Sequence, residues 1–191
     1  MNKLLLIIDC QYDFINGSLA VDGSEKVMNH LAEYIKKAKE NNIYTAAFAT
    51  VDWHPSTHFS FKENGGEWNA HCIQYSHGAA IYNNVLKELN EMPYFTVFTK
   101  GKQENREEYS IFKNAESKEN LIKQIEYMNI DEIDICGLCL DYCVINTVKD
   151  ALRVMPNIKI NILAKYSPSI GDASNAIKFI NNSERTAWVE E

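Results

Sequence analysis

The feature that most constrains the fold is a series of short apolar runs, each separated from the next by an amphipathic segment. The run at residues 3–8 is unbroken, which is typical of a strand covered on both faces of a parallel sheet. Alternation of this kind along the whole chain favours a parallel sheet with helices on both faces. The predicted strands span residues 3–8, 43–50, 94–99, 133–138 and 158–163, with a weak sixth at 186–189.

Helices are predicted where apolar residues recur at three- and four-residue spacing. Ser24, Ser117 and Asp172 can cap three of them, and residues 10–23 are expected to form a loop. The predicted helical segments lie within residues 25–40, 79–91, 118–128, 142–154 and 172–180. No repeat or compositional break marks a linker. The sequence therefore predicts a single doubly wound three-layer α/β/α domain over residues 1–191, with a mainly parallel six-stranded sheet.

Charge and cysteine content narrow the functional classes. A formal net charge of −7 argues against a nucleic-acid surface. No apolar run approaches the about 18 residues of a membrane span, and the first strand is followed by Asp9 rather than by a signal-peptide cleavage site. The odd count of five cysteines indicates reduced thiols. We expect a cytoplasmic protein with no nucleic-acid or membrane partner, and a homo-oligomer stays open.

Three chemically active residues follow predicted strands. Asp9 ends the first, Lys100 ends the third, and Cys143 follows the fourth after a short turn. The carboxyl ends of parallel strands form one edge of a sheet, where such folds bind their ligands, so we expect the three side chains to converge there. Taken singly, each has a simpler interpretation: a capping carboxylate, an exposed lysine and a small buried hydrophobe.

Cys143 begins the predicted helix at residues 142–154. A helix N-terminus acidifies a thiol through the macrodipole, and its unpaired N–H groups can stabilise an oxyanion. The position therefore favours a nucleophile. Cys136 and Cys139 also match a redox Cys-x-x-Cys motif, although the first of them falls inside the strand run rather than at a helix start.

The segment between the second strand and the next helix concentrates imidazoles. It contains four of the five histidines of the chain, namely His54, His58, His71 and His77. Asp52 and His54 are two residues apart, so in an extended segment both side chains point the same way. One carboxylate with two or three imidazoles suits Zn²⁺, Fe²⁺ or Mn²⁺. We expect one divalent metal ion per chain, with zinc the first choice.

These motifs together resemble the isochorismatase-like cysteine hydrolases, and within them the nicotinamidase/pyrazinamidase group. The resemblance covers nearly the whole chain. It is carried most specifically by the segments Asp52-Trp53-His54-Pro55-x-x-His58-x-Ser60-Phe61, Lys100-Gly101 and Asp141-Tyr142-Cys143-Val144, and by Trp68-x-x-His71-Cys72.

The resemblance implies a role for each matched catalytic residue. Cys143 would be the nucleophile, Asp9 the general acid and base, and Lys100 the cation that keeps Asp9 ionised and favours the thiolate. The metal ligands would be Asp52, His54 and His71, with His58 a ligand in only some members of the family.

The resemblance also implies a substrate site. Phe14 and Trp68 would sandwich a pyridine ring. The Leu138–Cys139 bond would be a cis peptide that directs the N–H groups of Cys139 and Cys143 at the oxyanion. The implied reaction is hydrolysis of nicotinamide, and also of pyrazinamide, through a thioester, as a step of NAD salvage.

The sequence departs from the family pattern at two places, and it leaves two alternative functions open. Cys139-Leu140 stands where the family usually has Ala-Thr, and Asn69 stands where it has proline.

One alternative function is that of another hydrolase of the superfamily, which acts on isochorismate, an N-carbamoyl compound or a ureido compound. The other is a metal-binding or redox-sensing module without turnover, and ammonia release from a carboxamide would separate it from an enzyme.

Overall fold

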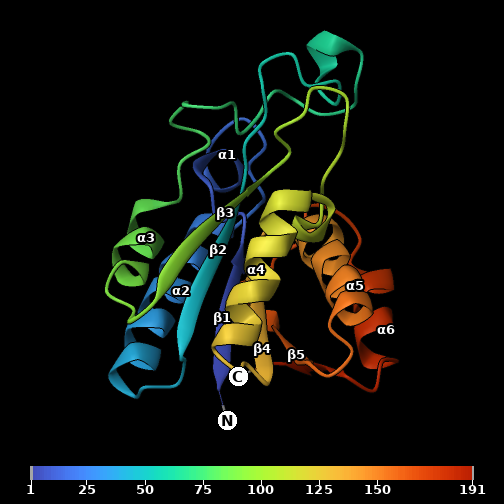
Figure 1. Cartoon of the computed structure of the whole chain (residues 1–191). Coiled ribbons are helices and arrows are strands. Elements are labelled where there is room, and N and C mark those ends of the chain that lie inside the picture. Colours follow the sequence, from blue (N-terminus) through green and yellow to red (C-terminus); the bar gives the residue numbers. More distant parts are fainter. Residues whose placement is uncertain (1, 191) are drawn as a thin grey trace.

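The computed structural model describes residues 2–190 and is built around one sheet of six parallel strands (Figure 1). The strand order is β3-β2-β1-β4-β5-β6, the doubly wound order in which the chain moves outward first on one side and then on the other. The predicted fold class is confirmed, and the sheet is wholly parallel. The strands are β1 (Lys3–Ile8), β2 (Ala46–Asp52), β3 (Phe95–Lys100), β4 (Glu132–Gly137), β5 (Lys159–Leu163) and β6 (Thr186–Val189).

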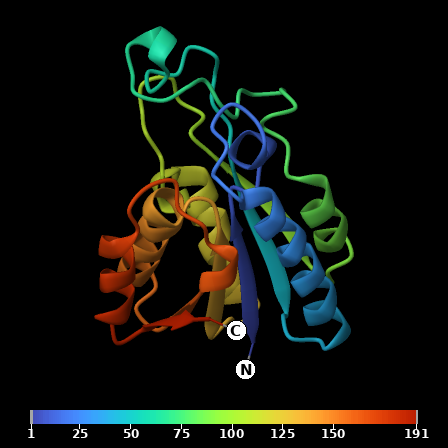
Figure 2. The same ribbon diagram turned by 180° about the vertical axis from the view of Figure 1, so that it is seen from behind.

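Helices cover both faces of the sheet, as Figures 1 and 2 show from opposite sides. The short helix α1 (Tyr12–Ile15) with α2 (Ser24–Glu40) and α3 (Asn83–Leu89) packs on one face. The opposite face is covered by α4 (Ala115–Tyr127), α5 (Ile145–Val154) and α6 (Ser174–Asn181). None of the helices within residues 2–190 is long and apolar enough to cross a membrane.

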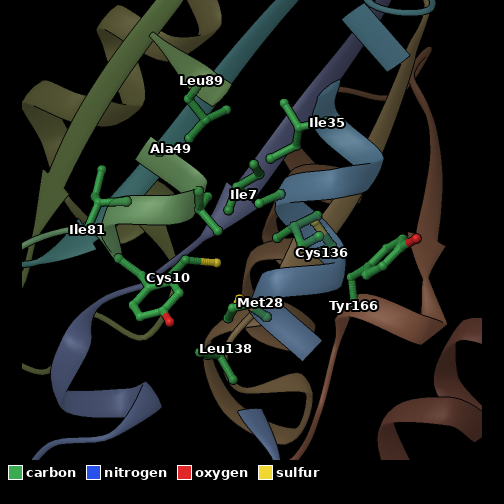
Figure 3. Close-up of a cluster of buried hydrophobic side chains, with 14 of the residues drawn as sticks. Ile7, Cys10, Met28, Ile35, Ala49, Ile81, Leu89, Cys136, Leu138 and Tyr166 are labelled. Carbon is green, nitrogen blue, oxygen red and sulfur yellow. The ribbon is translucent and has the colours of Figure 1, made fainter. Parts of the chain in front are cut away.

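The central strand β1 explains why its sequence does not alternate. Leu5 and Ile7 belong to the core beneath α2 and α3, whereas Leu4 and Leu6 belong to the core beneath α4 and α5. Figure 3 shows Ile7 inside the first of these cores. Each such side chain stabilises the fold by about 1.5–3 kcal/mol on full burial. A central strand with helices on both faces therefore needs apolar residues at every position.

The second strand differs from its prediction in a way that matters for function. It begins at Ala46 rather than at residue 43, because Ile43 donates its N–H to Ala38 and closes the end of α2. It also continues through Asp52, which pairs with Lys100 of β3. Asp52 is therefore held in the sheet rather than in the loop that follows.

Two predicted helix caps, Ser24 and Ser117, are wrong because their hydroxyls donate elsewhere. Residues 10–23 include α1 and are not wholly a loop. The Ser24 hydroxyl donates to carbonyl oxygens of α1 and does not cap α2. Asn114, and not Ser117, caps α4, since its side chain accepts the Ser117 N–H. Helix α6 begins at Ser174, two residues later than predicted, and the predicted Asp172 cap is confirmed, since its side chain accepts the N–H of Ser174.

The end of β4 requires glycine. Gly137 has a φ of +124°, and a Cβ added to it would lie 2.0 Å from the carbonyl oxygen of Ile8.

We expect Gly137→Ala to lower the free energy of unfolding by about 3 kcal/mol or more, because strain and a backbone clash combine. Gly23→Ala is the control, with a φ of +70° but open space around the added atom; it should cost about 1 kcal/mol. Equal losses in urea unfolding would contradict the close approach of β4 to β1.

Candidate active site

A buried lysine joins the ends of the central strands. Lys100 is fully buried at the end of β3, and its Nζ lies 2.7 Å from Oδ2 of Asp9 and 2.6 Å from Oδ1 of Asp52. The same ammonium lies 3.5 Å from Sγ of Cys143, in the turn after β4. The predicted convergence of Asp9, Lys100 and Cys143 is confirmed. Four neighbouring strands thus each place one reactive group at the same edge of the sheet.

Asp9 is turned into the site by its backbone. Its φ of +48° ends the pairing of β1, while its N–H still donates to the carbonyl oxygen of Thr50. The Thr50 hydroxyl donates to Oδ1 at 2.6 Å. Oδ2 forms the ion pair with Lys100 but makes no aligned hydrogen bond within residues 2–190. The Lys100 ammonium is therefore the charged neighbour of this oxygen, and the Thr50 hydroxyl is the hydrogen-bond partner of the other.

The two carboxylates around Lys100 differ in their proton affinity. Burial raises the pKa of Asp9 despite the neighbouring ammonium, and the charge of Asp52 adds to this effect. Burial also opposes ionisation of Asp52, but Lys100 and His54 outweigh it and hold its pKa well below the usual range. Burial would lower the pKa of Lys100, but the two carboxylates raise it, so it stays an ammonium. Asp9 is the one suited to proton transfer.

Cys143 lies in a π-helical turn, Leu140–Val144, that leads into α5. Burial raises the pKa of its thiol well above the usual value, although Lys100 acts in the opposite direction. The expectation of a thiol acidified by the helix N-terminus is therefore wrong for the free protein. A base is needed to form the thiolate. The carboxylate of Asp9 is within 4.8 Å of the sulfur.

Asp52, His54 and His71 form a group suited to a metal. One ligand atom from each lies within 4.8 Å of the others, and all three side chains are buried. Nδ1 of His54 donates to the carbonyl oxygen of Gly101 at 2.9 Å, and Nδ1 of His71 donates to that of Asn69 at 2.7 Å. In the neutral imidazoles these bonds would leave Nε2 as the metal-binding nitrogen. Nε2 of His54 lies 3.6 Å from Oδ2 of Asp52, so the two potential ligand atoms face each other. The donor set fits a divalent cation.

Gly101 permits this arrangement. Its φ is +67°, and a Cβ there would lie 2.4 Å from the imidazole ring of His54. Any side chain at this position would displace the ring from the carbonyl that orients it. The Lys100-Gly101 pair thus serves two centres, since the lysine joins the carboxylates and the glycine admits the histidine.

His58 is close to the triad but is engaged elsewhere. Its ring lies 4.2 Å from that of His54, centroid to centroid. Nδ1 is 2.7 Å from the Ser60 hydroxyl, and Nε2 donates to the carbonyl oxygen of Arg106 at 3.1 Å. A role as fourth ligand stays a prediction, and it would require one of these bonds to break.

A small pocket opens onto both centres, since Cys143 lines it together with Asp52 and His71. The predicted residues Phe14, Trp68 and Cys139 line it, whereas Leu138 is fully buried in the core. The remaining lining residues are Leu19, Asp52, His71, Glu107, Tyr109, Tyr142, Cys143 and Ile170. Glu107 and Tyr109 could not be predicted as site residues, because the polar segment after β3 has no periodicity.

The turn before Cys143 has the predicted backbone. The Leu138–Cys139 peptide is cis. Among residues 2–190 the N–H of Cys139 has no hydrogen-bond acceptor, and the residue lines the pocket. Cys136 and Cys139 are separate buried thiols, and burial raises the pKa of both. Neither is the acidic thiol that a redox pair requires.

Comparison with known proteins agrees with this geometry. The isochorismatase domain model matches residues 3–154. The chain belongs to the isochorismatase family. The Escherichia coli nicotinamidase is 32% identical over 182 residues, which cover 84% of this chain and 80% of its own. The prediction of a hydrolase similar to the nicotinamidase/pyrazinamidase group is confirmed.

Two solved structures of this family align over nearly the full chain. The pyrazinamidase of Pyrococcus horikoshii in complex with zinc has a TM-score of 0.84 at 29% identity and covers 100% of both chains. PnC1 from L. infantum in complex with nicotinate has a TM-score of 0.84 at 26% identity, over 98% of this chain and 92% of its own. The isochorismatase-family hydrolase described here therefore shares their whole architecture.

Removing the buried ammonium should destabilise the protein strongly. Lys100→Met would leave Asp9 and Asp52 buried without a counter-charge, so we expect a loss of about 3–5 kcal/mol in the free energy of unfolding. Lys3 also lies between two carboxylates, those of Glu132 and Asp134, but is partly exposed. Lys3→Met should cost about 1 kcal/mol or less. Similar losses for the two variants in urea unfolding would show that burial of the Lys100 cluster is unimportant.

Proposed function

We propose that this isochorismatase-family hydrolase converts nicotinamide to nicotinate and ammonia, and also accepts pyrazinamide. The observation that carries the proposal is the single pocket lined by both Cys143 and His71. A planar substrate in it would meet a nucleophile on one side and the metal triad on the other. The relatives named nicotinamidase and the neighbour that binds nicotinate support this substrate class.

The first half-reaction would form a thioester. Asp9 takes the thiol proton from Cys143, and Sγ attacks the carboxamide carbon. Lys100 stays protonated and stabilises the negative charge that passes between the sulfur and the carboxylate. An amide is a poor electrophile, so the developing oxyanion needs donors, for which we propose the N–H groups of Cys139 and Cys143. Asp9 then returns the proton to the departing ammonia.

The second half-reaction would use the same base. With ammonia gone, Asp9 accepts a proton from a water molecule that attacks the thioester carbonyl. When the carbon–sulfur bond breaks, Asp9 returns that proton to the departing Cys143 thiolate, which restores the free thiol and the carboxylate base. The acid product then loses its own proton to solvent and leaves as nicotinate. The raised pKa of Asp9 supports this alternation, since a base that exchanges protons in both directions works best when its pKa is not far from ambient pH.

The proposed metal ligands are Asp52, His54 and His71. When bound, a divalent cation at this triad, with zinc first and iron or manganese as alternatives, would orient the substrate through its ring nitrogen. The zinc complex of the P. horikoshii pyrazinamidase supports the choice of zinc. Asp52 would link the two centres because it also contacts Lys100.

The pocket walls favour a flat heteroaromatic ring. Phe14 and Trp68 line it, and the indole N–H of Trp68 donates to the hydroxyl of Tyr109. Aromatic side chains that bury a planar ring stabilise it through area and stacking. An aliphatic amide would leave these walls and the metal without a partner. We propose NAD salvage as the context, because nicotinate would be the product. The unpaired thiols support the proposal of a reducing, cytoplasmic compartment.

Steady-state ammonia release tests the reaction. Cys143→Ala should lose more than about 10³-fold of the turnover of nicotinamide, yet still bind nicotinate. Asp9→Asn should be similarly inactive. Asp52 is the other nearby carboxylate, but its lowered pKa makes it too weak a base to take over the proton transfer. The control Cys136→Ala removes a core thiol outside the pocket and should stay active. Metal-loaded protein that released ammonia from an aliphatic amide but not from nicotinamide would refute the substrate, and an active Cys143→Ala would refute the mechanism.

Metal stoichiometry tests the ligand set. His54→Ala should abolish stoichiometric metal while the circular dichroism spectrum is kept, because the histidine lies outside the apolar cores. The control is His77→Ala, since His77 is an exposed histidine in the same segment that packs against Tyr12. His58→Ala decides the fourth ligand: loss comparable with His54→Ala would confirm it, and unchanged binding would restrict the set to three. Metal retained in His54→Ala would show that the triad is wrong.

A further inference from the structure

Gln11 is a fully buried polar residue that the proposed mechanism does not use. Its Nε2 donates to the carbonyl oxygens of Asp52 at 2.7 Å and of Ala79 at 2.8 Å. Its Oε1 accepts the N–H of Asp52 at 2.8 Å. The side chain therefore bonds both polar groups of the Asp52 backbone, and it ties them to the far end of the histidine-rich segment.

The reason lies in how β1 ends. The pairing of β1 with β2 stops at Ile8 opposite Thr50, and Asp9 then turns away with its φ of +48°. Asp52, two residues further along β2, has no β1 backbone beside it. The Gln11 carboxamide offers one donor and one acceptor side, as a peptide group does. It replaces the missing strand and lets β2 continue to Asp52.

We infer that Gln11 is a positioning residue for the metal centre, acting through Asp52. The Asp52 carboxylate contacts Lys100 at 2.6 Å and belongs to the triad with His54 and His71. The Asp52 backbone is held by β3 on one side and by Gln11 on the other. This fixes the orientation of its carboxylate, which has to contact both the ammonium and the metal. The inference rests on the proposed metal site and assigns it a residue outside the ligand set.

The chain offers a matched control in the same region. Gln74 donates a single hydrogen bond to the carbonyl oxygen of Trp53, the residue after Asp52. Gln11→Met and Gln74→Met each replace a carboxamide by an apolar side chain of similar length. Only the first leaves the N–H and carbonyl groups of a metal ligand unpaired. Gln11→Asn is a second variant, which keeps the carboxamide but is too short to reach both partners.

Competition with a chromophoric chelator for Zn²⁺ measures the effect on the full-length protein. We expect Gln11→Met to weaken Zn²⁺ binding by about 10–100-fold, the usual effect of losing a residue that orients a ligand. Gln11→Asn should shift in the same direction and serves as the test if Gln11→Met does not fold. Gln74→Met should bind as the wild type does.

Two outcomes would overturn the inference, and they are distinguishable. Wild-type protein that bound no Zn²⁺ would refute the proposed metal site and the role of Gln11 with it. Wild-type binding together with the same affinity in Gln11→Met, or in Gln11→Asn, would refute the role of Gln11 alone. Because affinity is measured on folded protein, a loss of stability without a loss of Zn²⁺ affinity also counts against positioning.

Discussion

The structure depends on one buried ammonium, that of Lys100, shared between two carboxylates. Moving an ion out of water costs several kcal/mol, and only close opposite charges offset that cost. Asp9 at 2.7 Å and Asp52 at 2.6 Å supply those charges. Removal of any one of the three charges would leave a buried charge without full compensation. The cluster sits where the ends of β1, β2 and β3 meet, and the central sheet therefore holds the charges in place.

The same cluster gives two identical side chains different chemistry. Asp9 has the Thr50 hydroxyl on one oxygen and the ammonium on the other, and its carboxylate lies within 4.8 Å of the Cys143 sulfur. Asp52 has the ammonium and an imidazole, and it stays ionised. Because both carboxylates contact Lys100, the nucleophile and the proposed metal centre share one electrostatic unit. A change of charge in either centre should therefore alter the electrostatic environment of the other.

The segment between β2 and α3 is irregular, and it extends beyond the sheet edge (Figure 1). Side chains of the residues that follow β1 contact both of its ends, in addition to its internal hydrogen bonds and to those with the segment after β3. Gln11 bonds Asp52 and Ala79, and a carboxylate oxygen of Asp13 accepts the N–H of Cys72, next to His71. A loop without periodic hydrogen bonding needs such external partners. The first loop of the chain thus shapes the histidine-rich segment as well as carrying the base.

The strand-helix alternation, the end of β1 and the types of residue gathered at the strand ends could be predicted from the sequence, because burial has a local period and parallel strands share an edge. The family resemblance supplied the roles of those residues. The tertiary structure was needed for the contact of Asp52 with Lys100, the raised pKa of the buried Cys143 thiol and the presence of Glu107 in the pocket. Each of these features depends on strand register or on burial by segments that are far apart in the chain. A local sequence pattern cannot predict either.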